Sequence, residues 1–157
     1  MPERRNIKRK GWCITAGLLV SLCSTLATAV SFSPYPGKRQ VTVDRVEAPG
    51  IVVVTFDTDA AGFTRTLGIR LPHLVFAQDT PRSDDCEREA AGKVLPFMKD
   101  FLNSAKKVYI QDMRMENSAD TEAVSPLLTD KGSLSAALIK EGLARPDSVD
   151  PETPWCK

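Results

Sequence analysis

The run IVVVTF at residues 51–56 directly follows the turn dipeptide Pro49-Gly50 and strongly limits the folds that this chain can adopt. A run of β-branched and apolar side chains is typical of a buried β-strand, because such side chains fit a pleated surface. Before the turn, Val41, Val43 and Val46 give the alternation of a second strand. The two segments therefore predict an antiparallel hairpin.

Further strand and helix patterns follow the hairpin. Residues 64–71 alternate as a third strand, and residues 86–103 have the i, i+3, i+4 apolar spacing of an amphipathic helix, which Pro96 must kink or interrupt. Residues 107–113 and 127–129 predict two more strands, separated by a polar loop over residues 117–122. A last helix is predicted over residues 134–141, between the N-cap Ser133 and Gly142.

The N-terminus has the composition of an export signal. Five basic side chains precede an uncharged stretch at residues 11–37, and its apolar part ends at Ala27-Thr28-Ala29. Small residues at these positions suit a signal peptidase, so residues 1–29 predict a signal peptide cleaved after Ala29. The alternative is an uncleaved anchor in the inner membrane, because residues 12–30 almost reach the length of a spanning helix. A lipoprotein signal is disfavoured, since Leu22 precedes Cys23 where a small residue is required.

Both alternatives place the remaining chain outside the cytoplasm, in the periplasm or at the outer face of the inner membrane. Residues 30–40 contain two prolines and Gly37 and predict a linker, and residues 41–157 predict one globular domain. Cys86 and Cys156 are the two cysteines outside the signal. An even pair in an oxidising compartment predicts a disulfide bond, and the alternative is two buried thiols.

Export changes the charge balance of the protein. The whole chain has 21 basic and 20 acidic side chains, and loss of residues 1–29 leaves 16 basic and 19 acidic ones, a net charge of about −3. Tight binding to a phosphate backbone requires a basic excess or patch. A basic strip of Lys99, Lys106, Lys107 and Arg114 is conceivable, but solvated faces are favoured. The balance therefore favours a protein partner over nucleic acid.

Several segments resemble the staphylococcal-nuclease (thermonuclease) family. They are Ile69-Arg70-Leu71, the run CEREAAGK at residues 86–93 and the run SLSAALIKEGLA at residues 133–144, and the resemblance spans residues 41–145. It implies an α+β fold, namely a five-stranded OB-fold β-barrel with two or three packed helices. Active members cleave nucleic acid with the help of calcium.

The catalytic motifs of that family are degenerate here. The family's Asp-Gly-Asp-Thr reads EAPG at residues 47–50, so a calcium-binding aspartate falls on Pro49. The family's Arg-Leu-x-x-Ile-Asp-x-Pro-Glu reads RLPHLVFAQ at residues 70–78, which keeps the phosphate-binding Arg70 but places Val75 at a calcium ligand and Gln78 at the general base. The second phosphate-binding arginine falls near Glu122. Apolar or amide side chains supply neither hard oxygen ligands nor a useful base, so no metal or catalytic site is expected.

The candidate binding residues surround this degenerate site. Arg70 can still bind an anion, and Tyr109 can stack on bases, the combination with which OB barrels bind single strands. Val75 and Phe76 predict either an apolar docking patch or packing at the barrel end. His73 is the sole histidine, which excludes the usual zinc sites, and it is expected on a loop or the barrel rim.

The sequence thus predicts an exported, catalytically inactive nuclease-like domain without a cofactor, which binds an envelope protein or, less favoured, nucleic acid. The alternative is a calcium-dependent phosphodiesterase with a rearranged site. Asp57, Asp59 and Asp79 are the candidate ligands of that alternative, although carboxylates near turns are more often solvated.

Overall fold

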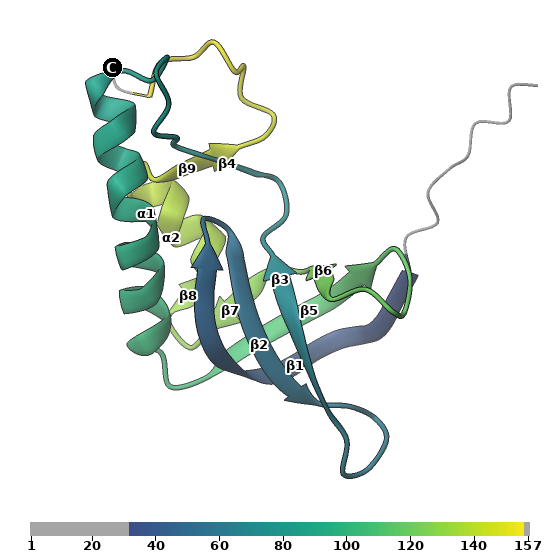
Figure 1. The fold of residues 1–157 in the computed structure, drawn as a ribbon. Helices are drawn as coiled ribbons and strands as arrows, with labels where there is room; N and C mark the ends of the chain where they lie inside the picture. Colours follow the sequence, from purple (N-terminus) through teal and green to yellow (C-terminus); the bar gives the residue numbers. More distant parts are fainter. Residues whose placement is uncertain (1–31, 156–157) are drawn as a thin grey trace, which may run out of the picture.

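The computed structural model describes residues 32–155, which form a β-barrel covered on one side by two helices (Figure 1). The proposed signal at residues 1–29 and Cys156 lie outside the described residues. Among residues 32–155, no helix combines the length and the apolar character needed to span a membrane.

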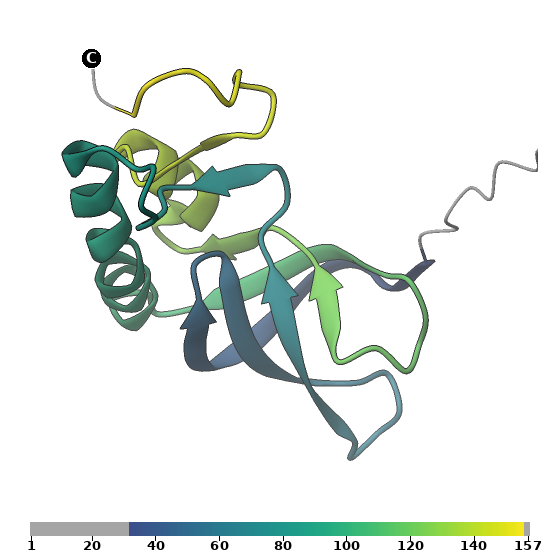
Figure 2. The same cartoon turned by 45° about the horizontal axis from the view of Figure 1, so that its top comes forward.

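Five strands close the barrel. They are β1 (Phe32–Ala48), β2 (Ile51–Asp57), β3 (Thr64–Arg70), β6 (Glu122–Val124) and β5 (Val108–Met115), in that spatial order, and β5 pairs back to β1. All neighbours are antiparallel except β3 and β6, which are parallel (Figure 2). The sequence prediction of an α+β barrel is confirmed at this level, and the strand order is consistent with an OB fold.

Four short strands lie outside this ring. β7 (Leu127–Thr129) continues along β5 after β6, and β8 (Gly132–Ser133) pairs with β7. β4 (Leu74–Phe76) and β9 (Ala144–Pro146) form a separate antiparallel pair. The polar loop predicted over residues 117–122 is shorter than expected, because β6 begins at Glu122.

The first hairpin forms as its sequence pattern predicts. Val52, Val54 and Phe56 of β2 are buried in the barrel, and β2 pairs with β1 through Val46↔Val52 and Thr42↔Thr55.

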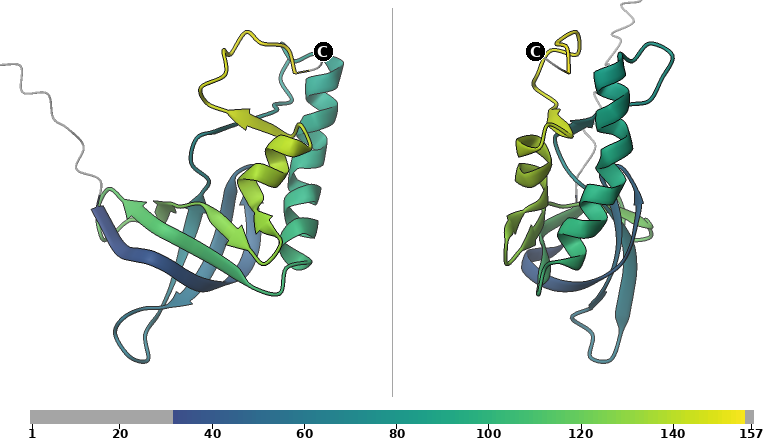
Figure 3. Two further views of the ribbon diagram at one scale, coloured as in Figure 1. Left: turned by 180° about the vertical axis from the view of Figure 1, so that it is seen from behind. Right: turned by 90° about the vertical axis from the view of Figure 1, so that its left-hand side faces the viewer.

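The helices seal one side of the barrel (Figure 3). α1 (Asp85–Asn103) buries Val94, Met98 and Leu102, and α2 (Leu134–Lys140) buries Leu134 and Leu138. Asp84 caps α1 by accepting a hydrogen bond from the Glu87 N–H at 2.7 Å, and Ser133 caps α2 as predicted. α1 continues through Pro96 without an interruption, so residues 85–103 form one helix.

The predicted linker at residues 30–40 is wrong for residues 32–40, which belong to β1. Tyr35 pairs with Met113, Gln40 pairs with Tyr109, and the Tyr35 ring meets the Phe56 ring edge-on at 5.2 Å. The ladder shifts register between Phe32 and Tyr35 and again between Tyr35 and Lys38. These shifts accommodate the prolines and Gly37, which made this segment resemble a linker, because proline is tolerated in strands at irregularities.

Candidate functional site

A groove runs along the ends of β3, β5 and β6. It has a volume of about 1220 Å³ and is lined by residues 70–74, 114–116, 119–124 and Asp147. A smaller hollow of about 280 Å³ adjoins it over β2 and β3 and shares Thr121 and Glu122 with it. Residues of both the predicted site and the loop before β6 therefore meet in one place.

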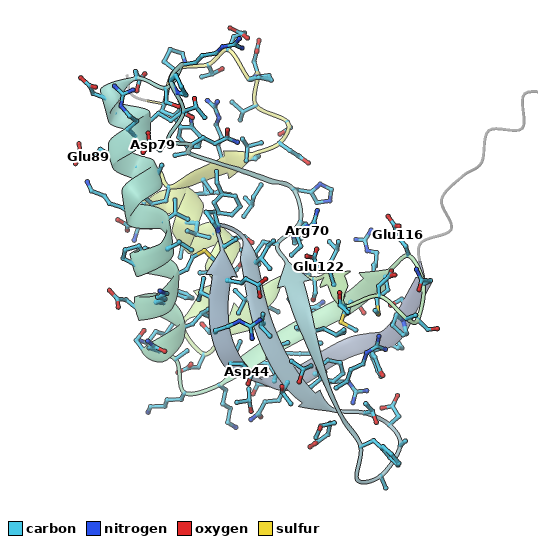
Figure 4. The ribbon with its side chains drawn as sticks, in the orientation of Figure 1. Asp44, Arg70, Asp79, Glu89, Glu116 and Glu122 are labelled. Carbon is cyan, nitrogen blue, oxygen red and sulfur yellow. The ribbon has the colours of Figure 1, made fainter. Side chains whose placement is uncertain are left out.

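Arg70, the last residue of β3, forms an ion pair with Glu122 at the start of β6 (Figure 4). The side chains are 58% and 48% exposed, so water screens the pair and its contribution to stability is at most about 1 kcal/mol. The geometry nevertheless supplies the Arg70 guanidinium with an internal anion. Glu122 is the position near which the family's second arginine was expected.

Gly68 explains how Glu122 reaches Arg70. Gly68 and Glu122 are register partners on the parallel strands β3 and β6, and the Gly68 N–H donates to the Thr121 carbonyl at 2.9 Å. A Cβ added at Gly68 would lie 3.3 Å from the Glu122 Cγ. The missing side chain leaves room for the Glu122 stem over β3, and the carboxylate then points toward the next outward residue, Arg70.

A second arginine lies on the other side of β6. Val124 is the register partner of both Arg70 on β3 and Arg114 on β5. Residues opposite one another in a ladder share a face of the sheet, and all three line the groove. The structure thus forms a row of two arginines that flank Val124, which is 38% exposed.

His73 marks one border of the groove. It is the predicted rim histidine: its backbone has φ 56°, and its Nδ1 lies 3.0 Å from the Asp147 Oδ2. The Asp147 N–H also donates to the His73 carbonyl at 3.2 Å. Because an ionised carboxylate only accepts, the imidazole Nδ1–H is the donor in the side-chain contact. The pair joins the entry of β4 to the exit of β9.

The two apolar candidates, Val75 and Phe76, do not share a face. β4 alternates, so Val75 is 39% exposed while Phe76 packs against the core. A Cβ at Gly50 would lie 2.5 Å from the Phe76 ring, which therefore covers the turn between β1 and β2. Of the two interpretations of this pair, barrel-end packing holds for Phe76, and Val75 alone is left for contact with a partner.

Tyr109 lies away from the groove. It sits near the start of β5, where its register partners are Gln40 and Leu128, and the Lys38 Nζ lies 4.1 Å from its ring centroid. The structure does not bring Tyr109 together with Arg70. The Tyr109 ring, the candidate for stacking on bases, is already in contact with the Lys38 ammonium group.

The basic strip does not form as one surface. Lys107 and Arg114 lie seven residues apart along β5 and its entry, or about 23 Å in an extended strand. The backbone N–H groups of Lys106 and Lys107 both donate to the Asp130 carboxylate, at 2.9 and 3.3 Å. Burial raises the pKa of Asp130, but these N–H groups, its own N–H and the charge of Lys131 lower it more, so the net pKa is lowered.

The substitute calcium ligands are not brought together. Asp57 ends β2 and Asp59 lies in the β2–β3 loop, whereas Asp79 precedes α1 at the opposite end of the molecule (Figures 1 and 4). Asp59 pairs with Arg39 at 2.5 Å. Within residues 32–155, no three histidine, cysteine, aspartate or glutamate side chains form a group that could hold a metal ion.

Cys86 lies in the first turn of α1. The tail after β9 returns toward that end of the helix (Figures 1 and 3). Arg145 holds this tail by donating hydrogen bonds to the carbonyls of Thr153 and Pro151. Its guanidinium carbon also lies 4.4 Å from the centroid of the Trp155 ring. The predicted partner Cys156 is outside the described residues, so the disulfide stays a prediction.

No protein-family model matches the chain, and no curated protein matches it either. The resemblance to the staphylococcal-nuclease family therefore stays an expectation from the motifs quoted above.

Proposed function

We propose that this chain is an exported, catalytically inactive relative of the staphylococcal-nuclease family that acts as a binding module for another envelope protein. Two features support the relationship. The barrel has a parallel pair, β3 and β6, and the long helix α1 lies between β3 and β5 in the chain. The run at residues 70–78 then follows β3 where the family motif would stand.

The observation that carries the inactive assignment is the Arg70–Glu122 ion pair. Phosphodiester cleavage needs cationic groups aimed at the negative charge that develops in the transition state. Here a carboxylate neutralises the one arginine that the motif retains, and it would repel a phosphate at that place. Pro49, Val75 and Gln78 add no calcium ligand or base at the other motif positions.

The charges of the groove favour a protein over nucleic acid as its ligand. Acidic side chains outnumber basic ones along it: Glu116, Asp120, Glu122 and Asp147 against Arg70, Arg114 and His73. A polyanion is disfavoured by this balance. Apolar residues such as Leu71, Leu74 and Val124 lie among the charges, and such a mixture is typical of protein interfaces.

A cross-linking and pull-down experiment on the chain in the cell envelope tests this function. We expect Val124→Asp to lose a partner that the unchanged protein retains. Ile139→Asp is the matched control, because Ile139 is 40% exposed on α2, close to the 38% of Val124. Equal retention by both variants would show that the groove is not the docking surface.

A calcium-dependent nuclease with a rearranged site is the second candidate from the sequence, although within residues 32–155 no three acidic side chains lie together as ligands for the ion. Its test is the cleavage of single- and double-stranded DNA and RNA with added calcium, beside an intact member of the family. We expect no cleavage by this chain under conditions in which the family member is active.

A further inference from the structure

The Glu122 carboxylate is held over β3 by the backbone as well as by its charge. Glu122 is paired in register with Gly68, and the preceding residue, Thr121, accepts the Gly68 N–H at 2.9 Å. The Glu122 stem lies over the position where Gly68 lacks a side chain. The carboxylate is therefore delivered to Arg70 by the same contacts that pair β3 with β6.

The bond between Glu122 and Arg70 is easily exchanged. Both side chains are about half exposed, and ion pairs of that kind are weak because water solvates either charge when they separate. The contact uses the Arg70 Nη2, whereas a guanidinium has five N–H donors and can bind a carboxylate through two of them. A competing carboxylate can therefore take the place of Glu122 at small cost.

Arg114 supplies a second cation for such a competitor. No ion pair joins Arg114 to any other described residue. Arg70 and Arg114 are both neighbours of Val124 in the sheet, so their backbones stand roughly 10 Å apart at the usual strand spacing. The long side chains can converge over Val124, whose exposed methyl groups offer an apolar contact between the two charges.

We propose that Glu122 is a built-in occupant of a carboxylate-binding site formed by Arg70 and Arg114. The partner protein displaces it with an acidic side chain of its own, and an adjacent apolar side chain of the partner rests on Val124. The inference rests on the proposed function, since it names the chemistry of the protein segment that docks in the groove. The internal carboxylate indicates which chemical group Arg70 accepts.

The test is the affinity of the chain, purified from the cell envelope, for a fluorescent octapeptide that has one leucine-glutamate pair among glycines and serines, at low salt. We expect Glu122→Gln to bind the peptide up to about fivefold more tightly than the unchanged protein, since the ion pair that the peptide must displace is weak. Adding Arg114→Gln to that variant should return the affinity to the original level. Glu122→Ser must show the same gain as Glu122→Gln, and the far-UV circular dichroism melt of each variant shows whether it is folded.

Glu116→Gln is the matched control. Glu116 lines the same groove and its substitution removes the same charge, but no ion pair joins it to an arginine among the described residues (Figure 4). An equal gain from Glu116→Gln would attribute the effect to net charge and overturn the displacement. Absence of a gain in Glu122→Gln would also overturn it, as would tighter binding of oligothymidylate without tighter binding of the octapeptide. The loss of the envelope partner in Val124→Asp is independent of these outcomes.

Discussion

The hydroxyl of Ser125 bonds both backbone polar groups of Gln111, as the backbone of a neighbouring strand would. The Ser125 Oγ accepts the Gln111 N–H at 2.9 Å and donates to the Gln111 carbonyl at 3.0 Å. Ser125 is 1% exposed, and its own N–H donates to the Arg70 carbonyl at 3.2 Å. The residue thus connects β3, β5 and the corner between β6 and β7. It supports the strand that delivers Glu122 and Val124 to the groove.

Replacing this hydroxyl should destabilise the barrel. In Ser125→Ala the buried polar groups of Gln111 lose their partner, which costs about 1–3 kcal/mol of the free energy of unfolding. Urea denaturation followed by circular dichroism measures the loss. Ser33→Ala is a milder comparison, because the Ser33 hydroxyl donates one bond, to the Met113 carbonyl, from an exposed position. A Ser125→Ala variant no less stable than Ser33→Ala would refute the bridging role.

A side chain at Gly50 should destabilise the contact between the first hairpin and β4. Gly50 has φ 77°, and an added Cβ would lie 2.5 Å from the Phe76 ring. We expect Gly50→Ala to cost more than the roughly 1–3 kcal/mol of a strained backbone position alone, because the ring must also move. Gly37→Ala separates the two effects in thermal melts, since Gly37 has φ 80° with nothing within 4 Å of its added Cβ. Equal losses of stability in Gly50→Ala and Gly37→Ala would mean that the Phe76 ring moves aside without a measurable cost.

Asp130 should make the stability of the fold depend on acidic pH. Burial raises its pKa, but the N–H groups of Lys107, Lys106 and Asp130 together with the charge of Lys131 lower it more, so the folded pKa lies below the ordinary 3.8. Because the pKa of Asp130 is lower in the folded than in the unfolded protein, the ionised carboxylate stabilises the fold at pH values above the unfolded pKa. This stabilisation is lost as the pH falls through the folded pKa.

Asp130→Asn should therefore be less stable than the unchanged protein near pH 7, and the difference should shrink below about pH 4. Denaturation midpoints between pH 2 and 7 provide the measurement. Asp57→Asn is the matched control, because it removes an exposed carboxylate at the end of β2 that accepts no backbone N–H from the described residues. A constant gap between Asp130→Asn and the parent across this range would contradict the linkage.

Arg145 should hold the C-terminal tail on the domain. It donates to the Thr153 and Pro151 carbonyls and lies against the Trp155 ring. Arg145→Ala removes all three contacts, so limited proteolysis after residue 147 should become faster. The cleavage rate of Arg145→Lys should lie between those of the unchanged protein and Arg145→Ala, because an ammonium group keeps the charge but lacks the planar fork of donors. Unchanged cleavage in Arg145→Ala would show that the tail is held by other contacts.

Much of the secondary structure was predictable because its signals are local. The β-branched run of β2, the alternation of β3 and the apolar spacing of α1 each reflect which face of one element is buried. The β1 extension was missed, since its prolines suit a linker as well as an irregular strand. β4, β6, β8 and β9 have at most three residues each, too few for a periodic pattern.

The candidate site was predictable only in part. Arg70 and His73 were identified from the motif, and both line the groove. Arg114 and Val124 were not assigned to it, because their neighbourhood depends on β5 and β6 pairing at Arg114↔Val124. Phe76 was assigned to the surface as one option, and its contact with Gly50 across the barrel end decides otherwise.

Most strands and both helices of residues 32–155 could be located from the amino-acid sequence, since they depend on residue type and short-range spacing. The tertiary structure decided what Arg70 binds. Arg70 and Glu122 are 52 positions apart in the chain, and only the parallel pairing of β3 with β6 across Gly68 brings the carboxylate to the guanidinium. A contact of that kind depends on how distant strands align, which no local pattern records.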